Sequence, residues 1–405
     1  MYQLWFYLIH KSVKFLMGST SVGKTFETII VGAGPGGLMA GRYLKDALIL
    51  EQKEEIGKPI QCAEGLSKRF LDRYEIKPDP NWISAIVDNT QIVLPNKKVI
   101  NFFAKGELYI IDRTNFEKFL AGQCRAQIQL KNRVIDIERE NEIWKIKTEK
   151  GEIFKSKYLI GADGPLSIVR RKVFKKEIRI LPCIEYLVKL EKELNTSEIK
   201  VYFDKEKLPS GYAWIFPKSN HSANIGLGIV GKGNLNLIFK DFLENTVKKE
   251  FGNYELLENK SGPVPWEGAL IKMVKDNALL VGDAAGLVNP ISGGGIGNAM
   301  ISGETAAKSI LSGDINSYEL KIKSLPDFSD NLFLAQRILY SLDNQTFNEI
   351  GEVLERVGGN ILKFKNPEVI SAFLTKPNLR KNIPKFLKLY SIYKKYKPSM
   401  TSSNF

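Results

Sequence analysis

Apolar runs that end in glycine recur three times along the chain. They begin at Ile29, Tyr158 and Ala278 and read IIVGAGPGG, YLIGADG and ALLVGDAAG. Each has the composition of a buried strand, and each leads toward residues compatible with a helix. The pattern therefore predicts three strand–turn–helix units whose turns are formed by glycine and aspartate.

The segments between these runs predict further elements. Residues 134–139 and 143–149 read as strands, and residues 111–125 predict a helix with Asp112 or Thr114 as its cap. Residues 178–270 alternate between short strands and turns. A small-residue helix is expected at 294–311, and a mostly helical, lysine-rich region begins near residue 320.

The order of these elements predicts an α/β protein with two interleaved units. We expect a Rossmann-like nucleotide-binding domain built from residues 26–75, 105–177 and 271–318, and a mixed-sheet substrate domain at 76–104 and 178–270. A helical region at 319–405 follows, and residues 1–25 form an N-terminal extension.

Two phosphate-binding patterns lie back to back near the N-terminus. Residues 18–25 fit the P-loop pattern G-x-x-x-x-G-K-[ST], and residues 32–37 fit the dinucleotide pattern G-x-G-x-x-G. A P-loop must be followed by a helix, but residues 26–31 read as a strand, so the order of the elements does not fit a P-loop. Glu51 closes a second apolar run, where an acid is expected to accept ribose hydroxyls. The sequence therefore favours a dinucleotide site.

A second G-x-G-x-x-G match, at residues 226–231, is not expected to bind a nucleotide. Ile225, Leu227 and Ile229 alternate around it as in a half-buried strand, and no helix start adjoins it. A second nucleotide domain is therefore not predicted.

The chain of 405 residues carries a net charge of +14 and has a pI of about 9.3, which invites anionic partners. The lysines are spread along the chain, often beside glutamate, and no basic tract interleaved with aromatic residues occurs. We therefore predict a lysine-rich surface and no nucleic-acid partner.

Cysteine and histidine are scarce. Cys62, Cys124 and Cys183 form no CxxC pair, and only His10 and His221 are present. This usage predicts a reducing compartment, the cytoplasm, and no metal site or serine–histidine triad. Any difficult chemistry is then expected from an organic cofactor.

The first sixteen residues are aromatic and apolar, but their uninterrupted run is under ten residues long. This is too short to span a bilayer, and the segment lacks the features of a signal peptide. It lies on a surface, or Met17 is the true start.

The third turn favours FAD over NAD. Asp283 is placed at a strand end to accept a sugar or ribityl hydroxyl, and the glycines of segment 293–297 leave backbone N–H groups unobstructed at a helix start. Such a positive helix end stabilises negative charge, which reduced flavin carries on its N1–C2=O edge.

The three turns together resemble the flavoprotein family of p-hydroxybenzoate hydroxylase-type monooxygenases and geranylgeranyl reductases. Residues 161–164 with Ser167 and Arg170 match its middle motif, and Asp112-Arg113 resembles its helix-opening arginine. The resemblance implies that the Rossmann-like domain binds FAD, with Glu51 on the adenosine ribose and Asp283 on the ribityl chain. The cofactor-binding residues it implies are Gly32, Gly34, Pro35, Gly37, Glu51, Cys62, Ala63, Arg113, Asp163, Gly164, Asp283, Gly293, Gly294, Gly295 and Ile296.

Two stretches resemble the archaeal-type geranylgeranyl reductases, the digeranylgeranylglycerophospholipid reductases. LPSGYAWIFP at 208–217, followed by the glycines of 226–228, matches the signature P-x-x-Y-x-W-x-F-P…G-x-G. GKPIQCAEG at 57–65, with Cys62 and Glu64, is similar to the segment that these enzymes place near the flavin.

The resemblance implies saturation of isolated prenyl double bonds by flavin hydride plus a proton. Tyr212 and Trp214 are then catalytic candidates whose ring faces stabilise positive charge. The implied substrate-binding residues are Tyr212, Trp214, Phe216 and Pro290. The same stripe also fits ordinary core packing, since Ala213 and Ile215 alternate with the rings.

Cys62 is also a catalytic candidate, with two interpretations open. A thiol is a poor acid toward an alkene, so Cys62 either places substrate and tunes the flavin or is a buried small hydrophobe.

Two other functions stay open. One is an NAD(P)H-dependent monooxygenase of the same fold, and the other is a prenyl-lipid carrier similar to Rab escort-type proteins. For the reductase, the expected partners are a prenylated lipid and an electron donor such as ferredoxin, a quinol or NAD(P)H.

Residues 382–398 combine lysines with aromatic and aliphatic residues. This segment is either a basic amphipathic helix that rests on the inner membrane face or a packed terminal helix with a solvated face.

Overall fold

The computed structural model describes residues 25–231, 233–266, 268–270, 272–356, 371 and 374–400. The predictions for residues 1–16 and for most of the P-loop pattern lie outside these residues. Thr25, the last residue of that pattern, begins strand β1 (Thr25–Val31). The pattern therefore leads into a strand and not into a helix, as predicted.

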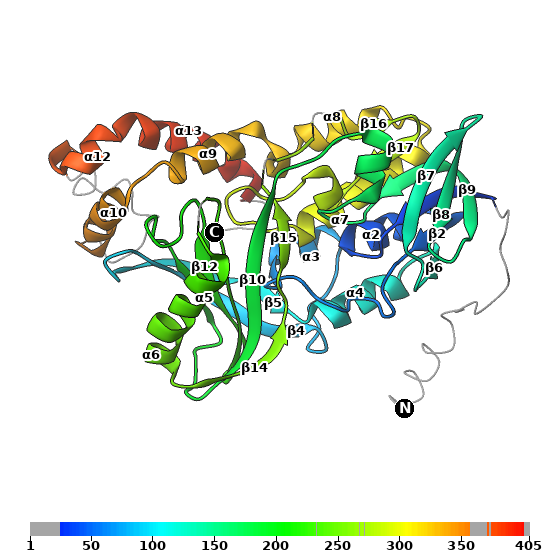
Figure 1. The fold of residues 1–405 in the computed structure, drawn as a ribbon. Helices are drawn as coiled ribbons and strands as arrows, with labels where there is room; N and C mark the ends of the chain where they lie inside the picture. The colour runs from blue at the N-terminus through cyan, green and yellow to red at the C-terminus, as the bar shows by residue number, and fades with distance from the viewer. Residues whose placement is uncertain are drawn as a thin grey trace.

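Two sheets form the frame of the molecule (Figure 1). The first has eight strands among the described residues, in the order β16-β17-β9-β1-β2-β6, with β8 pairing β9 and β7 pairing β8. Its strands are β1 (Thr25–Val31), β2 (Ala47–Leu50), β6 (Gln127–Gln129), β7 (Val134–Glu140), β8 (Ile143–Thr148), β9 (Ile153–Gly161), β16 (Val274–Lys275) and β17 (Ala278–Leu280).

The second sheet has nine strands among the described residues, in the order β14-β10-β13-β12-β11-β4-β5-β3, with β15 also pairing β10. Its strands are β3 (Gly65–Ser67), β4 (Ile83–Val93), β5 (Val99–Ile111), β10 (Ile180–Leu190), β11 (Glu198–Tyr202), β12 (Tyr212–Ser219), β13 (Ser222–Gly228), β14 (Tyr254–Asn259) and β15 (Gly262–Pro265).

Helices cover both sheets and fill the C-terminal region. They are α2 (Pro35–Tyr43), α3 (Lys68–Arg73), α4 (Arg113–Gly122), α5 (Leu235–Phe242), α6 (Lys248–Phe251), α7 (Ile296–Leu311), α8 (Ser317–Ser324), α9 (Asp330–Leu339), α10 (Asn344–Arg356), α12 (Pro377–Lys381) and α13 (Ile383–Met400). Short π-helical turns occupy η1 (Arg170–Phe174) and η2 (Leu243–Val247), and 3₁₀ turns occupy η3 (Gly282–Ala285) and η4 (Pro326–Phe328).

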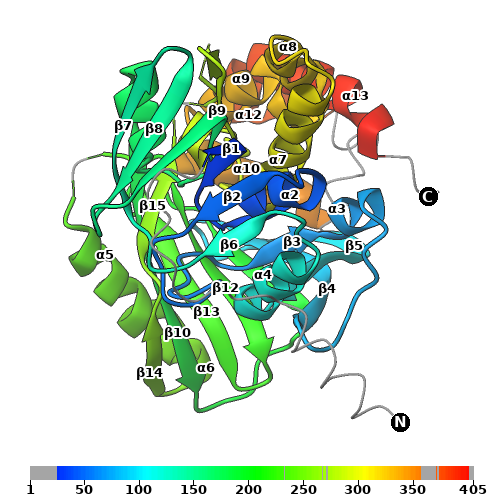
Figure 2. The same ribbon diagram turned by 90° about the vertical axis from the view of Figure 1, so that its right-hand side faces the viewer.

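The first sheet contains the three strands that the apolar runs predicted. Strand β1 pairs in parallel with β2 and with β9, and β9 pairs in parallel with β17. The three predicted turns therefore meet at one edge, because the carboxyl ends of parallel strands lie together. Figure 2 shows α2 and α7 on one side of β1 and β9, and the β7–β8 ribbon on the other.

The second sheet has one face on a hydrophobic core and the other toward the first sheet. Ala213 and Ile215 of β12, with Ile225 and Leu227 of β13, pack under α5 and α6 in one core cluster. Because side chains alternate along a strand, Tyr212, Trp214 and Phe216 lie on the opposite face. The alternation predicted for this strand is confirmed.

The α/β fold class and the helical C-terminal region are confirmed. Sheet membership, however, moves two predicted boundaries. Strand β3 (65–67) and residues 105–111 of β5 were predicted in the nucleotide-binding domain, but both pair within the second sheet. Sequence periodicity does not show which sheet a strand will join, because that depends on long-range pairing.

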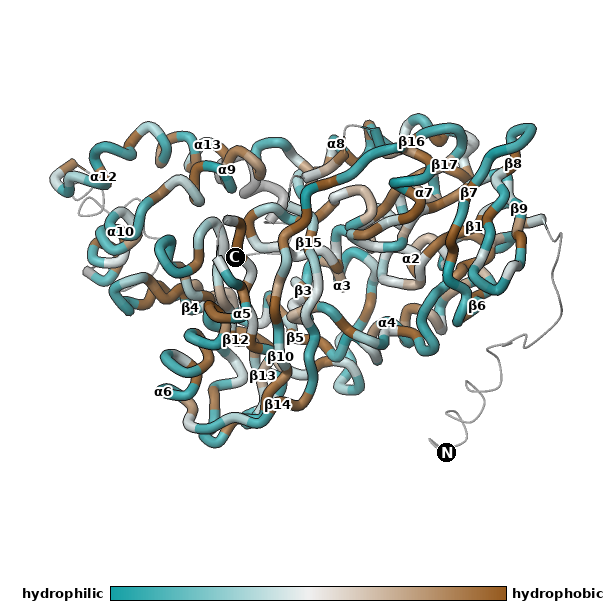
Figure 3. Tube along the Cα trace, viewed as in Figure 1, coloured by the Kyte–Doolittle hydropathy of each residue, from teal (hydrophilic) through white to brown (hydrophobic). Residues whose placement is uncertain are grey.

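The C-terminal helices gather at one end of the molecule, where α10 and α12 share a core cluster with Leu94 and Ile100 of the β4–β5 hairpin. Figure 3 shows brown and teal residues alternating along α9, α12 and α13, as expected for helices with one buried face. Within the described residues, none of the helices combines the length and apolar character needed to cross a bilayer.

Candidate functional site

The first turn joins β1 to α2 and is shaped for an anion. Gly32 has φ +102°, and a Cβ there would lie 2.4 Å from the carbonyl oxygen of Ala162, so only glycine fits against the neighbouring turn. A Cβ on Gly34 would meet nothing within 4 Å. Helix α2 begins at Pro35 without a side-chain cap, which leaves N–H groups at its start available to a phosphate. Gly37 lies in the same turn of helix.

Glu51, at the end of β2, is buried beside this turn. Its carboxylate accepts hydrogen bonds from the backbone N–H of Ala33 at 2.6 Å and of Lys53 at 2.9 Å. The side chain thus fastens β2 to the glycine turn. It lies where a ribose acceptor was predicted, and each carboxylate oxygen keeps a further lone pair.

The second turn uses Asp163 to hold itself together. The carboxylate accepts from Ser167 Oγ at 2.6 Å and from the backbone N–H of Ile168 at 2.6 Å and Val169 at 3.1 Å. Burial raises the pKa of Asp163, and these hydrogen bonds oppose the shift. The structure thus gives Asp163 a role in building the turn. The adjoining Gly164, with φ +74°, has open space beside it.

Arg170 ties the second turn to the third. Its guanidinium is almost fully buried and donates to the carbonyl oxygens of Pro165 at 2.7 Å and Ala284 at 3.0 Å. With Gly32 packed on Ala162, the three turns form one connected unit.

Asp283, in the third turn, is the carboxylate most suited to a ligand. Among the described residues its side chain has no hydrogen-bond or ion-pair partner, and a Cβ on Gly295 would lie 3.0 Å from its Oδ1. Burial raises the pKa of Asp283, and the positive charge of Arg113 opposes that shift. A desolvated carboxylate without a partner fits a ligand that donates hydroxyl groups.

The glycine-rich segment 293–295 leads into α7, whose first residue is Ile296. Gly295 is the N-cap without a side-chain hydrogen bond, and the first turn of α7 contains no acid. The positive end of this 16-residue helix therefore lies near the Asp283 carboxylate, and the first turn of the helix itself holds no acid that would neutralise it. Together, an acceptor of hydroxyls and a helix end that favours anions fit a flavin nucleotide.

Contacts from distant elements hold this segment. Tyr212 Oη of β12 donates to the carbonyl oxygen of Ser292, and Gln336 Nε2 of α9 donates to that of Pro290 at 2.9 Å. Tyr340 Oη lies 3.4 Å from the carbonyl oxygen of Ile291. Pro290 is buried here, so the C-terminal helical region helps to shape the third turn.

The aromatic stripe divides into two parts. The rings of Tyr212 and Trp214 lie with centroids 5.6 Å apart, and the indole Nε1 donates to Glu185 Oε2 at 2.9 Å. Phe216 instead packs on a small core cluster with β4, β5 and Ile199. Tyr212 and Trp214 thus lie beside the third turn and a polar network, and Phe216 contacts apolar neighbours.

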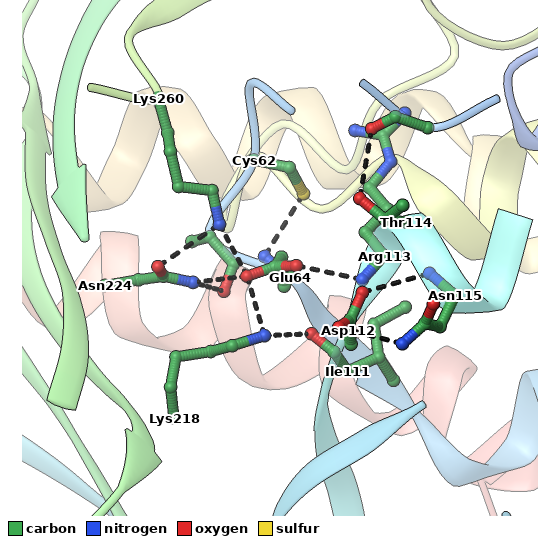
Figure 4. A network of polar contacts seen from close by, with 12 residues as sticks. Cys62, Glu64, Ile111, Asp112, Arg113, Thr114, Asn115, Lys218, Asn224 and Lys260 are labelled. Atoms are coloured by element: carbon green, nitrogen blue, oxygen red, sulfur yellow. Dashed lines mark hydrogen bonds and ion pairs between the residues drawn. The ribbon is translucent and has the colours of Figure 1, made fainter. Parts of the chain in front are cut away.

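A buried ionic network centres on Glu64 (Figure 4). Its Oε2 accepts from Lys260 Nζ at 2.5 Å and Asn224 Nδ2 at 2.8 Å, and it forms an ion pair with Lys218 Nζ at 2.9 Å. Its Oε1 accepts from the backbone N–H of Arg113 at 2.9 Å. Burial acts to raise the pKa of Glu64, but the two ammonium groups outweigh it and hold that pKa below its usual range. Glu64 also has φ +69°, a strained conformation for a residue with a side chain.

Cys62 lies beside this network. Its Sγ accepts from the backbone N–H of Glu64 at 3.2 Å, and Asn224 Nδ2 donates to the carbonyl oxygen of Ala63 at 3.2 Å. Burial raises the pKa of the Cys62 thiol, and the charge of Arg113 opposes that shift. The thiol is therefore neutral near pH 7, and a neutral thiol is a poor nucleophile.

Arg113 connects the network to the third turn. Its Nε donates to Glu117 Oε1 at 2.6 Å, and no hydrogen-bond partner among the described residues reaches its terminal amino groups. Burial acts to lower the pKa of Arg113, but the negative charges of Glu117 and Asp283 contribute to raising it overall. As predicted, Asp112 caps the helix that Arg113 opens, accepting from Asn115 N at 3.0 Å.

Sequence reasoning missed several members of the site. These are Glu185, Lys218, Asn224, Lys260 and Gln336. A weak signal existed for Glu185, because it stands inside the apolar run LPCIEYLVKL, where a charge is unusual unless paired. The others have no local pattern that marks them.

Comparisons with known proteins agree with this arrangement. Residues 180–264, which hold β10 to β14 and most of β15, match the family model of the geranylgeranyl reductase catalytic domain. The digeranylgeranylglycerophospholipid reductase of Methanocaldococcus jannaschii is 31% identical over 385 residues, covering 88% of this chain and 97% of that protein. The chain belongs to the digeranylgeranylglycerophospholipid reductase family. The protein of that name from Methanosarcina acetivorans is 34% identical over 321 residues, 73% of this chain and 78% of that protein.

Solved structures share the fold. A geranylgeranyl bacteriochlorophyll reductase-like protein of Thermoplasma acidophilum has a TM-score of 0.73 and 26% identity, covering 89% of this chain and 99% of that one. A flavin-dependent brominase has a TM-score of 0.62 at 16% identity, covering 89% of this chain and 99% of that one, and shows the fold alone. This member of the digeranylgeranylglycerophospholipid reductase family therefore has a flavoprotein fold.

The spacing of the aromatic and glycine signature has a physical reason in this family member. Trp214 pairs with Gly226, and Tyr212 pairs with Gly228, across the β12–β13 ladder. A Cβ on Gly226 would lie 2.4 Å from the Trp214 ring, and one on Gly228 would lie 2.7 Å from Cys183 Sγ. The two glycines thus make room for side chains on the face that looks toward the turns.

Proposed function

We propose that this protein is an FAD-dependent reductase that saturates isolated C=C bonds of geranylgeranyl chains in membrane lipid precursors. Its membership of the digeranylgeranylglycerophospholipid reductase family supports this reading. The observation that carries the proposal is the hydrogen bond from Tyr212 to Ser292, because it brings the aromatic stripe against the glycine-rich segment suited to a flavin.

FAD fits the residues of the three turns. Gly32 to Gly37 would take its pyrophosphate, Glu51 its adenosine ribose, and Asp283 with the start of α7 its ribityl chain and ring edge. When bound and reduced, the flavin supplies the hydride for the reaction.

An isolated alkene has no carbonyl group to polarise, so positive charge develops on a tertiary carbon as the bonds form. The ring faces of Tyr212 and Trp214 stabilise such charge, by about 0.5–2 kcal/mol each. Trp214 is 7% exposed and its indole is fixed by Glu185. A fixed, buried ring loses little free energy to reorganisation when the charge appears.

The carboxylates of the polar network are paired with cations. Lys218 and Lys260 both contact Glu64, and Arg113 pairs with Glu117. Exclusion of water from this buried region protects a cationic intermediate from hydration.

The electron donor is proposed by chemical class, as ferredoxin, a quinol or NAD(P)H. Contact with the inner face of an anionic membrane is also proposed. Leu387 and Tyr390 of α13 are exposed beside Lys385 and Lys388, a combination that suits a lipid surface. Phe386 packs in the core of the C-terminal region, so one face of the helix is buried. The side chains of residues 393–400, which include other lysines of the predicted helix, lie outside the described ones.

The decisive experiment is anaerobic incubation of the chemically reduced protein with geranylgeranyl lipids, followed by mass spectrometry. Successive gains of two hydrogens support the reductase. Gain of one oxygen from a phenol in air, with NADPH-stimulated flavin reduction, would support the monooxygenase. Protein purified without yellow colour would support a lipid carrier.

A further inference from the structure

Glu185 lies in a row of three residues that crosses the second sheet. Gly226 of β13 pairs with Trp214 of β12 on one side and with Glu185 of β10 on the other. The indole of Trp214 occupies the space that a side chain at Gly226 would fill and reaches Glu185 Oε2 at 2.9 Å. Two residues that are 29 positions apart thus form one unit on the face toward the turns.

The second carboxyl oxygen of Glu185, Oε1, differs from the first in its surroundings. Oε1 is buried without a hydrogen bond among the described residues, and the nearest cation, Lys260 Nζ, lies 4.0 Å away. That ammonium group is already bound to Glu64 at 2.5 Å and to Asn224 Oδ1 at 3.2 Å. A carboxylate in this setting would leave half its charge uncompensated, so the neutral acid is the more stable form.

The groups around Glu185 come from several elements. They are Cys62, Glu64, Cys183, Tyr212, Lys218 and Lys260. Burial raises the pKa of Glu185 to about 8, and the negative charge of Glu64 adds to the shift. Lys260, the hydrogen bond from Trp214 and Lys218 oppose it. Near neutral pH the carboxyl group therefore holds a proton inside the protein.

We propose that Glu185 is the proton donor of the saturation reaction. This inference rests on the proposed function. One alkene carbon gains hydride from the reduced flavin, and the other gains the proton that leaves Oε1 of Glu185. The carboxylate left behind is stabilised by the Trp214 N–H and the nearby Lys260 ammonium. Water reprotonates Glu185 after product leaves, and the external two-electron donor reduces the flavin again.

The test compares Glu185→Gln with Glu258→Gln. Gln keeps the size of the side chain and the acceptor for Trp214 but carries no acidic proton. Glu258 is an exposed acid on β14 and serves as the matched control. Because a general acid contributes about 10²–10⁴-fold, E185Q is expected to lower the rate of saturation at least 100-fold with flavin content unchanged. E258Q is expected to match the wild type. An E185Q rate within about threefold of the wild-type rate would overturn the proposal.

A second measurement needs neither substrate nor turnover. The fluorescence of Trp214 in the flavin-loaded protein, obtained by subtracting the signal of Trp214→Phe, is expected to change with a midpoint near pH 8 because Glu185 ionises beside the indole. E185Q is expected to abolish this change. Absence of the change in the wild-type protein between pH 6 and 9.5 would overturn the proposal even if E185Q failed to fold. A wild-type protein that shows the change but saturates no lipid would contradict the proposed function alone.

Discussion

The phenol of Tyr212 donates its hydrogen to the carbonyl oxygen of Ser292, and so joins the middle of the second sheet to the glycine-rich segment that precedes α7. Replacement of Tyr212 by Phe removes this bond and keeps the ring. We expect a slower rate of saturation at saturating lipid, with flavin content retained. Tyr186→Phe, on the opposite face of the sheet against Phe239, is the matched control and is expected to have wild-type kinetics. Equal rates for the two variants would show that the hydrogen bond between Tyr212 and Ser292 has no part in turnover.

Asp283 is expected to determine flavin affinity. A hydrogen bond to a charged acceptor contributes about 1.5–3 kcal/mol, so Asp283→Ala should weaken flavin binding roughly 10- to 150-fold. The measurement is flavin released into ultrafiltrate, followed by its fluorescence. Asp276→Ala, at a more exposed acid in the β16–β17 turn, is the control. Unchanged retention in Asp283→Ala would contradict the assignment of this carboxylate to the cofactor.

Gly226 is expected to tolerate no side chain. Because a Cβ there would lie 2.4 Å from the Trp214 ring and 2.6 Å from the carbonyl oxygen of Ile184, Gly226→Ala forces the indole or the strand to move. Overpacking of this kind costs about 1–3 kcal/mol of unfolding free energy. Chemical denaturation measures the loss. Gly122→Ala, where the added methyl group meets nothing within 4 Å, should be near neutral.

Stability should depend on pH through Glu185. Its pKa is about 8 in the folded protein and near 4.3 in an unfolded chain, so the folded state binds the extra proton between these values. Stability therefore falls as pH rises through that window, by up to about 1.4 kcal/mol per pH unit from this group. Glu64 has the opposite sign, since its depressed pKa gives stability that is lost only as pH falls. Urea denaturation from pH 5 to 9 should show a steeper decline for the wild type than for Glu185→Gln.

Membrane contact should depend on the exposed face of α13. Leu387 is 63% exposed, so Leu387→Glu is expected to reduce co-sedimentation with anionic vesicles. Leu320→Glu on α8, at a leucine that is 73% exposed, is the control for the added charge. Truncation before Pro384 should have at least the effect of Leu387→Glu. If truncated and full-length protein co-sediment equally, the helix does not dock on membranes.

The features predictable from sequence were those built by short segments. The glycine turns, the cap at Asp112 and the alternation of β12 are local devices, so their spacing alone was informative. Asp163 illustrates the limit of that reasoning: its turn was found, but its carboxylate is used within the turn itself. The network around Glu64 was not predictable, because Lys260 is 196 residues away and meets it only through the pairing of the second sheet.

Gln336 and Tyr340, in the C-terminal helical region, contact the backbone carbonyl groups of Pro290 and Ile291 in the third turn. The C-terminal helical region therefore positions backbone of the candidate site and is not structurally independent of it. Exchange of C-terminal segments between relatives should therefore succeed only where the incoming helix carries its own donors for the carbonyl groups of Pro290 and Ile291.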